Sequence, residues 1–97
     1  MTRPFLSEAD RADVFRGLAH PLRREVLLQL KRGDHSVGEL LELAGSGVTM
    51  PTLSRHLAIL RGAGLVRQRK AGQKRVYRLQ NQASQRALRW LKQLYLH

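Results

Sequence analysis

Side chains that could bind phosphates or base edges are concentrated in residues 49–62, which read TMPTLSRHLAILRG. Leu53, Leu57 and Leu60 recur at helical spacing, so this segment is predicted to be a helix that buries one apolar stripe. The opposite face carries small, hydroxyl-bearing and cationic residues, namely Pro51, Arg55 and Ala58, flanked by Thr52 and Ser54, with Arg61 near the end. Hydroxyls can bond phosphates, and arginine can make a two-pronged contact to guanine. An ordinary amphipathic helix with a solvated polar face is the alternative.

The overall charge also indicates a polyanionic partner. The 97 residues include 18 Lys and Arg against 7 Asp and Glu, a net charge of +11, which exceeds what solubility requires. A membrane surface could attract the same charge, but no apolar run has transmembrane length and no signal peptide is apparent. We therefore expect a cytoplasmic protein with no membrane partner. The aromatic content of 5% argues against a base-stacking platform for single strands.

Metal, thiol and catalytic chemistry are not supported by the residue types. The chain has no cysteine, which excludes disulfides, thiol switches and thiolate metal sites. His20, His35 and His56 show no i, i+4 pairing, and the C-terminal segment offers only His97 and no carboxylate. Ser54 and His56 are two residues apart on a helix and point apart, so they form no nucleophilic pair. We expect no metal, no cofactor and no enzyme activity.

Three helices are predicted before the segment at residues 49–62, within one domain covering residues 1–97. The first spans residues 7–19. The second runs from Pro21 to about Arg32, with Leu22, Val26, Leu27 and Leu30 inward and Arg23, Arg24 and Lys31 outward. The third begins at a capping box formed by Ser36 and Glu39. A glycine-containing turn then leads to the next helix, so residues 36–62 are predicted to form a helix-turn-helix.

The residues after that helix predict a basic β-hairpin at 65–79. Gly62 and Gly64 are expected to supply left-handed positions that end the helix. Two short strands are separated by Ala71-Gly72-Gln73, and they carry six cations, Arg67, Arg69, Lys70, Lys74, Arg75 and Arg78. Such a hairpin suits a phosphate backbone and forms a wing. Protection of an exposed sheet edge would account for only one or two of these cations.

The last predicted helix, residues 82–96, has an unusually wide apolar side, made of Ala83, Ala87, Leu88, Trp90, Leu91, Leu94, Tyr95 and Leu96. Packing of the whole side within one chain is the alternative to a partner surface. We predict a second copy as the partner, with contacts through Val14, Phe15, Leu18, Ala87, Trp90, Leu91, Leu94 and Tyr95. A twofold dimer would place two reading helices side by side on an inverted-repeat DNA site.

Residues 14–79 resemble the ArsR/SmtB family of bacterial winged-helix repressors. The likeness is carried by LAHPLRREVLLQL at 18–30, TLSRHLAILRGAGLV at 52–66 and RQRKAGQKRVYRL at 67–79. It implies a mostly helical homodimeric repressor with four helices, a β-hairpin wing and a final helix that pairs with the first across the dimer. It also implies groove contacts from Met50, Pro51, Ser54 and Arg55 and wing contacts within residues 69–75. Cysteines or paired Asp and His ligands, through which many members sense metals, are missing, and the turn GSGVT is longer than usual.

The leading hypothesis is a sequence-specific dimeric repressor without metal or thiol sensing. Its predicted DNA-binding residues are Thr49, Met50, Pro51, Thr52, Ser54, Arg55, His56, Arg61, Arg69, Lys70, Gln73, Lys74 and Arg75. His56 is interpreted as a structural or phosphate-facing group rather than a metal ligand. Two other hypotheses stay open, a sequence-neutral architectural DNA-binding protein and a protein-interaction module that uses the final helix.

Overall fold

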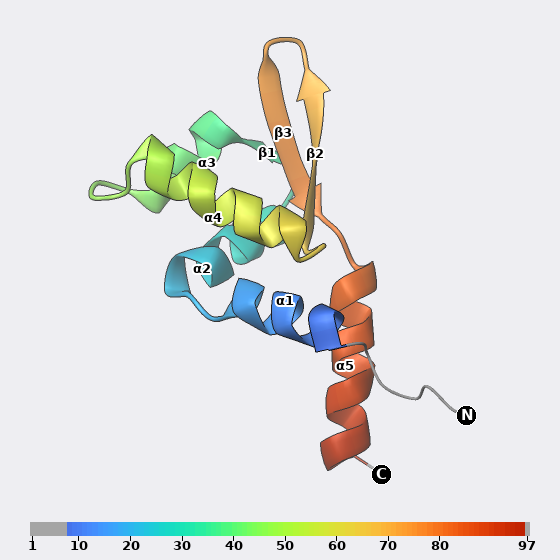
Figure 1. The fold of residues 1–97 in the computed structure, drawn as a ribbon. Helices are drawn as coiled ribbons and strands as arrows, with labels where there is room; N and C mark the ends of the chain where they lie inside the picture. Colours follow the sequence, from blue (N-terminus) through green and yellow to red (C-terminus); the bar gives the residue numbers. More distant parts are fainter. Residues whose placement is uncertain (1–7, 97) are drawn as a thin grey trace.

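A computed structural model describes the backbone of residues 8–96 and the side chains of residues 13–96. The elements in chain order are α1 (Glu8–Leu18), α2 (Pro21–Lys31), β1 (His35–Ser36), α3 (Val37–Ala44), α4 (Met50–Gly62), β2 (Val66–Ala71), β3 (Lys74–Leu79) and α5 (Gln82–Tyr95). The predicted winged helix-turn-helix order is confirmed, with one strand added (Figure 1). The helix start predicted at residue 7 lies outside the described residues.

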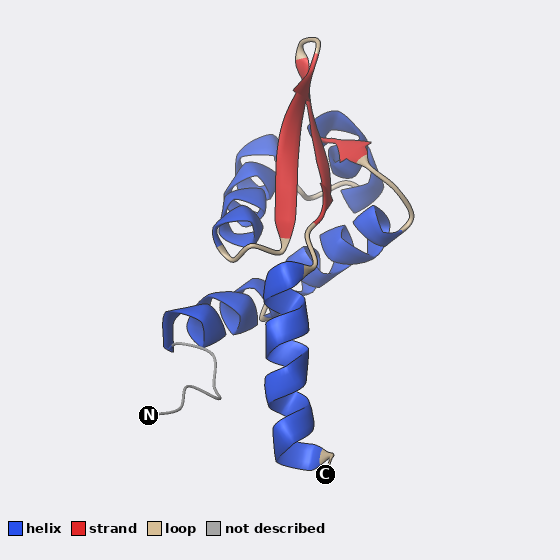
Figure 2. Ribbon diagram, turned by 90° about the vertical axis from the view of Figure 1, so that its right-hand side faces the viewer, coloured by secondary structure: helices blue, strands red, loops and turns tan. Residues whose placement is uncertain are grey.

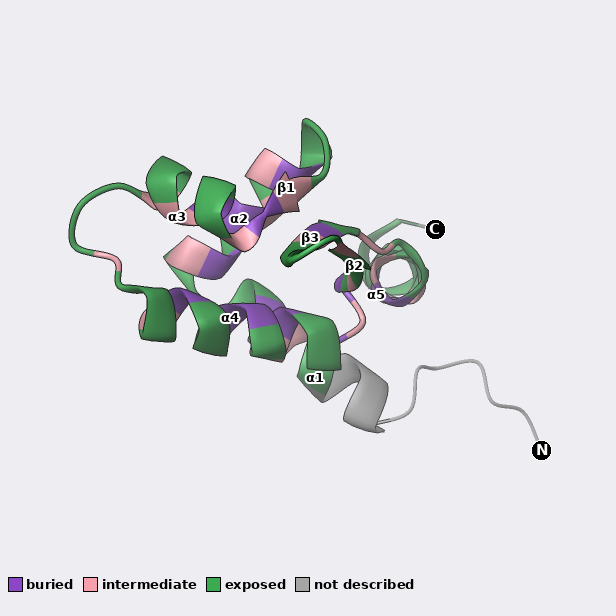
Figure 3. Ribbon diagram, turned by 90° about the horizontal axis from the view of Figure 1, so that it is seen from above, coloured by how far each residue is buried: buried purple, intermediate pink, exposed green. Residues whose placement is uncertain are grey.

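The apolar stripe of α4 forms the centre of the core. Leu53, Leu57 and Leu60 are 0%, 1% and 0% exposed. Around them pack the other buried apolar residues, Val14, Val26, Leu30, Leu40, Ala63, Leu65, Val66, Tyr77, Ala83 and Ala87. Truncating a leucine so buried to alanine costs about 2–5 kcal/mol. In Figure 3, α4 runs along the lower edge of the molecule with α2 and α3 above it, so the face of α4 turned away from them is left exposed.

Local hydrogen bonds fix where the helices begin. The predicted capping box of α3 is present: the Ser36 N–H donates to Glu39 Oε1 at 2.7 Å, and the Glu39 N–H donates to Ser36 Oγ at 3.2 Å. The first of these bonds is the main reason that the pKa of Glu39 is lowered. Thr49 caps α4 by accepting the Thr52 N–H at 3.4 Å, with Pro51 in the first turn. These caps set the direction in which α4 leaves the turn.

The end of α4 differs from the sequence prediction. Gly64 has a φ of +75°, as expected for a left-handed position, but Gly62 is the last helical residue and does not have a positive φ. The cap residue is Ala63, with φ −80°. One left-handed residue is therefore enough to turn the chain into β2.

The wing is part of a three-stranded antiparallel sheet with strand order β1-β3-β2. β2 and β3 pair from Val66 opposite Leu79 to Ala71 opposite Lys74. β1 was not predicted, because a two-residue strand shows no alternation; it adds His35 opposite Tyr77 and Ser36 opposite Val76. This third strand ties the base of the wing to the start of α3.

α5 packs on α1 near its beginning and then extends away from the other elements, as Figures 1 and 2 show. Ala83 and Ala87 are buried, whereas its last two turns are largely exposed. The long axis of the chain is accordingly 48 Å, against 27 and 22 Å for the other two. No helix within residues 8–96 has the length and apolar character required to cross a membrane.

Candidate nucleic-acid interface

The outer face of α4 presents most of the predicted reading residues to solvent. Those exposed are Thr49, Met50, Pro51, Ser54, Arg55 and Arg61. Thr52 is half-buried, and its hydroxyl oxygen accepts a 3.1 Å hydrogen bond from the Thr49 hydroxyl. Because the leucine stripe anchors the helix from behind, these groups sit on a rigid support, which favours defined contacts over adaptable ones.

The strand register places like charges directly across from each other in the wing. Arg67 lies opposite Arg78, and Lys70 lies opposite Arg75. Directly opposed like charges destabilise an antiparallel pair by roughly 0.2–1 kcal/mol each. The predicted contact residues Arg69, Lys70, Gln73, Lys74 and Arg75 are all exposed. The wing thus concentrates positive charge, which lowers the stability of the strand pair. Binding an anionic partner would offset this loss.

One acidic residue contacts the base of the wing. Asp34 lies 3.9 Å from Arg69 Nη2 and 3.9 Å from Arg78 Nε. Exposed pairs of this kind contribute about 0–1 kcal/mol each. Among the residues that the structure describes, no carboxylate lies within ion-pair distance of Lys70, Lys74 or Arg75. The tip of the wing therefore makes no such ion pair, although the charge of Glu39 on α3 interacts with that of Lys74.

The structure removes His56 from the set of exposed contact residues. Its side chain is 8% exposed, and its Nδ1 lies 3.2 Å from Nη1 of Arg23 on α2. Arg23, predicted to point outward, is also 8% exposed. The His20 ring stands 4.4 Å from the His56 ring, and His20 Nδ1 accepts the Leu22 N–H at 3.0 Å as the cap of α2. This cluster joins α2 to the back of α4 rather than facing a ligand.

Burial lowers the pKa of His56, and the nearby charges of His20, Arg23 and Arg55 lower it further. The unfolded chain, with an ordinary value of 6.5, therefore takes up the proton more readily than the folded protein. The stabilisation from the neutral ring is complete above that value and is lost as pH falls through it toward the lower folded pKa.

We therefore expect the melting temperature to fall more between about pH 7.5 and about pH 5.5 in the natural protein than in His56→Gln. Glutamine can still accept a hydrogen bond from Arg23 but does not titrate in this range. Thermal melts of both proteins across this range measure the difference. Identical pH dependence in the two would show that His56 does not carry the effect.

The predicted dimerisation residues separate into buried and exposed groups. Val14 and Ala87 are 2% and 4% exposed and belong to the core of the chain itself, so their assignment to a partner contact is corrected. Phe15 and Trp90 are half-buried with ring centroids 5.8 Å apart. Exposed apolar side chains remain at Leu18, along α5 at Leu88, Leu91, Leu94 and Tyr95, and at Leu96, the residue that follows the helix. We call these last five residues the α5 apolar face.

The described residues contain no group of three or more His, Asp or Glu side chains placed to hold a metal ion. Instead, His35 Nδ1 lies 2.8 Å from the Gly33 carbonyl oxygen, and the His20 and His56 rings pack together between α2 and α4. The position of His97 lies outside the described residues.

Comparisons with known proteins agree with this geometry. A family described as a helix-turn-helix domain matches residues 18–69. The biofilm growth-associated repressor of Xylella fastidiosa (strain 9a5c) is 36% identical over 85 residues, covering 80% of this chain and 73% of that protein. The HTH-type regulator Rv0081 of Mycobacterium tuberculosis (strain H37Rv) is 42% identical over 67 residues, covering 69% of this chain but only 58% of its own length. The crystal structure of the ArsR family transcriptional regulator RHA00566 superposes with a TM-score of 0.84 at 27% identity, covering 93% of this chain and 91% of that one.

Proposed function

The chain belongs to the ArsR/SmtB family of winged helix-turn-helix transcriptional repressors, and we propose that it binds an inverted-repeat operator as a homodimer, without metal or thiol sensing. In this proposal α4 reads base edges in a major groove, and the wing binds the phosphates beside it. The proposed reading residues are Met50, Pro51, Ser54 and Arg55, with Lys70, Lys74 and Arg75 on the wing. His56 serves to hold α4 in place.

The observation that carries the proposal is the combination of a rigid polar helix face with a cation-rich hairpin. Arg55 and Ser54 are exposed on a helix that is anchored by three buried leucines. The wing that follows carries opposed cations without enough nearby carboxylates to neutralise them. Neutralised phosphates supply affinity, whereas side chains on base edges supply discrimination, so the two parts suit complementary tasks.

The α5 apolar face supports the dimer. Leu88, Leu91, Leu94, Tyr95 and Leu96 are 46%, 36%, 50%, 77% and 66% exposed, which is a large apolar surface for one helix. Covering it with a second copy would relate two α4 helices by a twofold axis. The operator half-sites should then be centred about 34 Å apart along the DNA, or a small multiple of that spacing.

Selection of bound genomic fragments, followed by sequencing and binding titrations on synthetic duplexes, tests this function. We expect one recurring inverted repeat that binds far more tightly than a shuffled duplex of the same composition. Equal affinity for all duplexes would favour a sequence-neutral architectural protein. Absence of DNA binding would favour a protein-interaction module.

We expect DNA affinity to be unchanged by zinc or by thiol oxidants. The chain has no cysteine, and residues 82–97 contain no carboxylate that could join His97 in a metal site. Binding titrations in the presence of zinc, a chelator or a mild oxidant should superimpose. Tight stoichiometric zinc binding by calorimetry, with release from DNA, would contradict this part of the proposal.

A further inference from the structure

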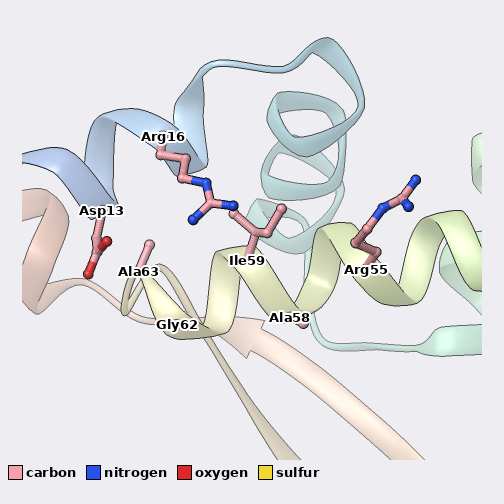
Figure 4. A pocket seen from close by; sticks show the side chains of 7 residues that line it. All are labelled: Asp13, Arg16, Arg55, Ala58, Ile59, Gly62 and Ala63. Atoms are coloured by element: carbon pink, nitrogen blue, oxygen red, sulfur yellow. The ribbon is translucent and has the colours of Figure 1, made fainter.

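A depression between α1 and α4 lies beside the proposed reading face. It has a volume of about 410 Å³ and is lined by Asp13 and Arg16 of α1 and by Arg55, Ala58, Ile59, Gly62 and Ala63 at the outer side and end of α4. We call it the α1–α4 groove. Figure 4 shows Asp13 and Arg16 pointing from α1 toward α4. In Figure 1 the wing rises on one side of α4 and α1 lies on the other.

α1 is held firmly in this position by a close approach to the core. A Cβ added at Gly17 would lie 2.6 Å from Leu65 Cδ1 and 3.4 Å from the Ala63 Cβ, so a larger residue here would require the buried Leu65 side chain to shift. Val14, one turn earlier, is 2% exposed. Arg16 is therefore attached to a helix with little freedom to shift relative to α4.

The floor of the groove contains a glycine, Gly62, whose missing side chain is not needed for the fold. Gly62 lies within α4 without a positive φ, and a Cβ added there would meet nothing within 4 Å. Alanine would be more favourable in this helix by up to about 1 kcal/mol. Together with Ala58, this glycine leaves room for an external group to approach the helix backbone closely.

Positive charge borders this open floor. Arg16 and Arg55 are both exposed, and within the described part of the chain neither has a carboxylate within 4.0 Å. Asp13 lines the same groove one helical turn before Arg16 but does not pair with it. Figure 4 shows the Arg55 side chain pointing away from Arg16, in keeping with its proposed role at base edges, so an anion on the groove would be attracted mainly by Arg16 and repelled by Asp13.

We propose that the α1–α4 groove binds a sugar-phosphate segment of the operator, on the side of α4 away from the wing. This inference rests on the proposed DNA-binding function. A helix in the major groove, which is about 12 Å wide, has a phosphate strand on each side. The wing is placed to contact one strand, and Arg16 of α1 contacts the other. Asp13 lowers the affinity of this second contact.

Two opposite charge changes test the assignment. Arg16→Gln should weaken binding to operator and shuffled duplexes alike, by about tenfold at low salt, and reduce the slope of log affinity against log salt by about one. Asp13→Asn should strengthen binding to both duplexes and steepen that slope. Gly62→Ala should keep or raise the melting temperature while weakening DNA binding, because its methyl group fills the floor.

Lys31→Gln is the control, since it removes one exposed charge of α2 outside the groove. It should leave the salt slope near that of the natural protein. The inference fails if the natural protein binds its operator and Arg16→Gln behaves like this control, a result that leaves the proposed function intact. It also fails if both charge changes weaken binding, or if Arg16→Gln changes the mass in solution, because α1 would then act through folding or assembly. An absence of DNA binding by the natural protein would overturn the proposed function itself.

Discussion

Replacing Leu91 and Leu94 by glutamine is expected to convert a dimer into a monomer and to lower operator affinity by about 10²–10⁴-fold. Both leucines belong to the α5 apolar face; Leu94 is 50% exposed and Leu91 36%, so each keeps a substantial apolar surface that a partner could cover. Burying each leucine side chain against a partner contributes roughly 1.5–3 kcal/mol. Because two joined half-site contacts bind far more tightly than one, separating the two copies should strongly lower the affinity for the operator.

Sedimentation or light scattering at micromolar concentration measures this result. The double variant should have a mass near the 11.1 kDa of one chain and the natural protein twice that value. Glutamine is a good helix former, so circular dichroism should show α5 intact. Gln93→Ala, an exposed change on the same helix, should leave both mass and affinity unchanged. A natural protein that is already monomeric would contradict the proposed assembly.

Trp90 is a less informative target than these leucines. Its ring lies 5.8 Å from that of Phe15, so it is part of the contact between α1 and α5 in one chain. A polar residue at Trp90 would disturb folding together with assembly. The sequence predicted a wide apolar side on this helix, but periodicity alone does not tell which part a chain buries in itself; Ala87 and Val14 illustrate this.

Long periodic segments were predictable because spacing and caps agree. The leucine stripe of α4 and the capping box at Ser36 determine those two helices locally, and both are present. β1 depends instead on pairing between His35 and Tyr77, which are distant in sequence. Nothing in two residues alone indicates such a partner.

The outward placement of Arg23, and the inclusion of His56 among the DNA-binding residues when a structural role was also open, come from giving charge more weight than position. His56 is three residues after Leu53 and four before Leu60, which puts it on the buried side of α4. Arg23 is three residues before Val26 and seven before Leu30, which puts it on the buried side of α2. The spacing therefore contained the signal, but the contact between the two side chains is tertiary and appears only in the structure.

Arg55→Ala is expected to cost about 1–3 kcal/mol on the preferred operator and much less on a shuffled duplex. Arg55 is exposed on the outer face of α4, where a guanidinium can donate two hydrogen bonds to a guanine edge. Losing that contact removes discrimination between sequences. A change in the wing should act differently, since Lys74 lies at the tip, where it meets phosphates that every sequence shares.

Lys74→Ala should accordingly weaken both duplexes by a similar factor and reduce the slope of log affinity against log salt by about one. Titrations of both variants on both duplexes, over a range of salt concentrations, separate base reading from phosphate binding. The contrast is informative because each variant removes one positive charge, so a purely electrostatic protein would treat them alike. If Arg55→Ala lost equal affinity on operator and shuffled DNA, α4 would not be reading sequence, and a neutral DNA coat would explain the basic surface better.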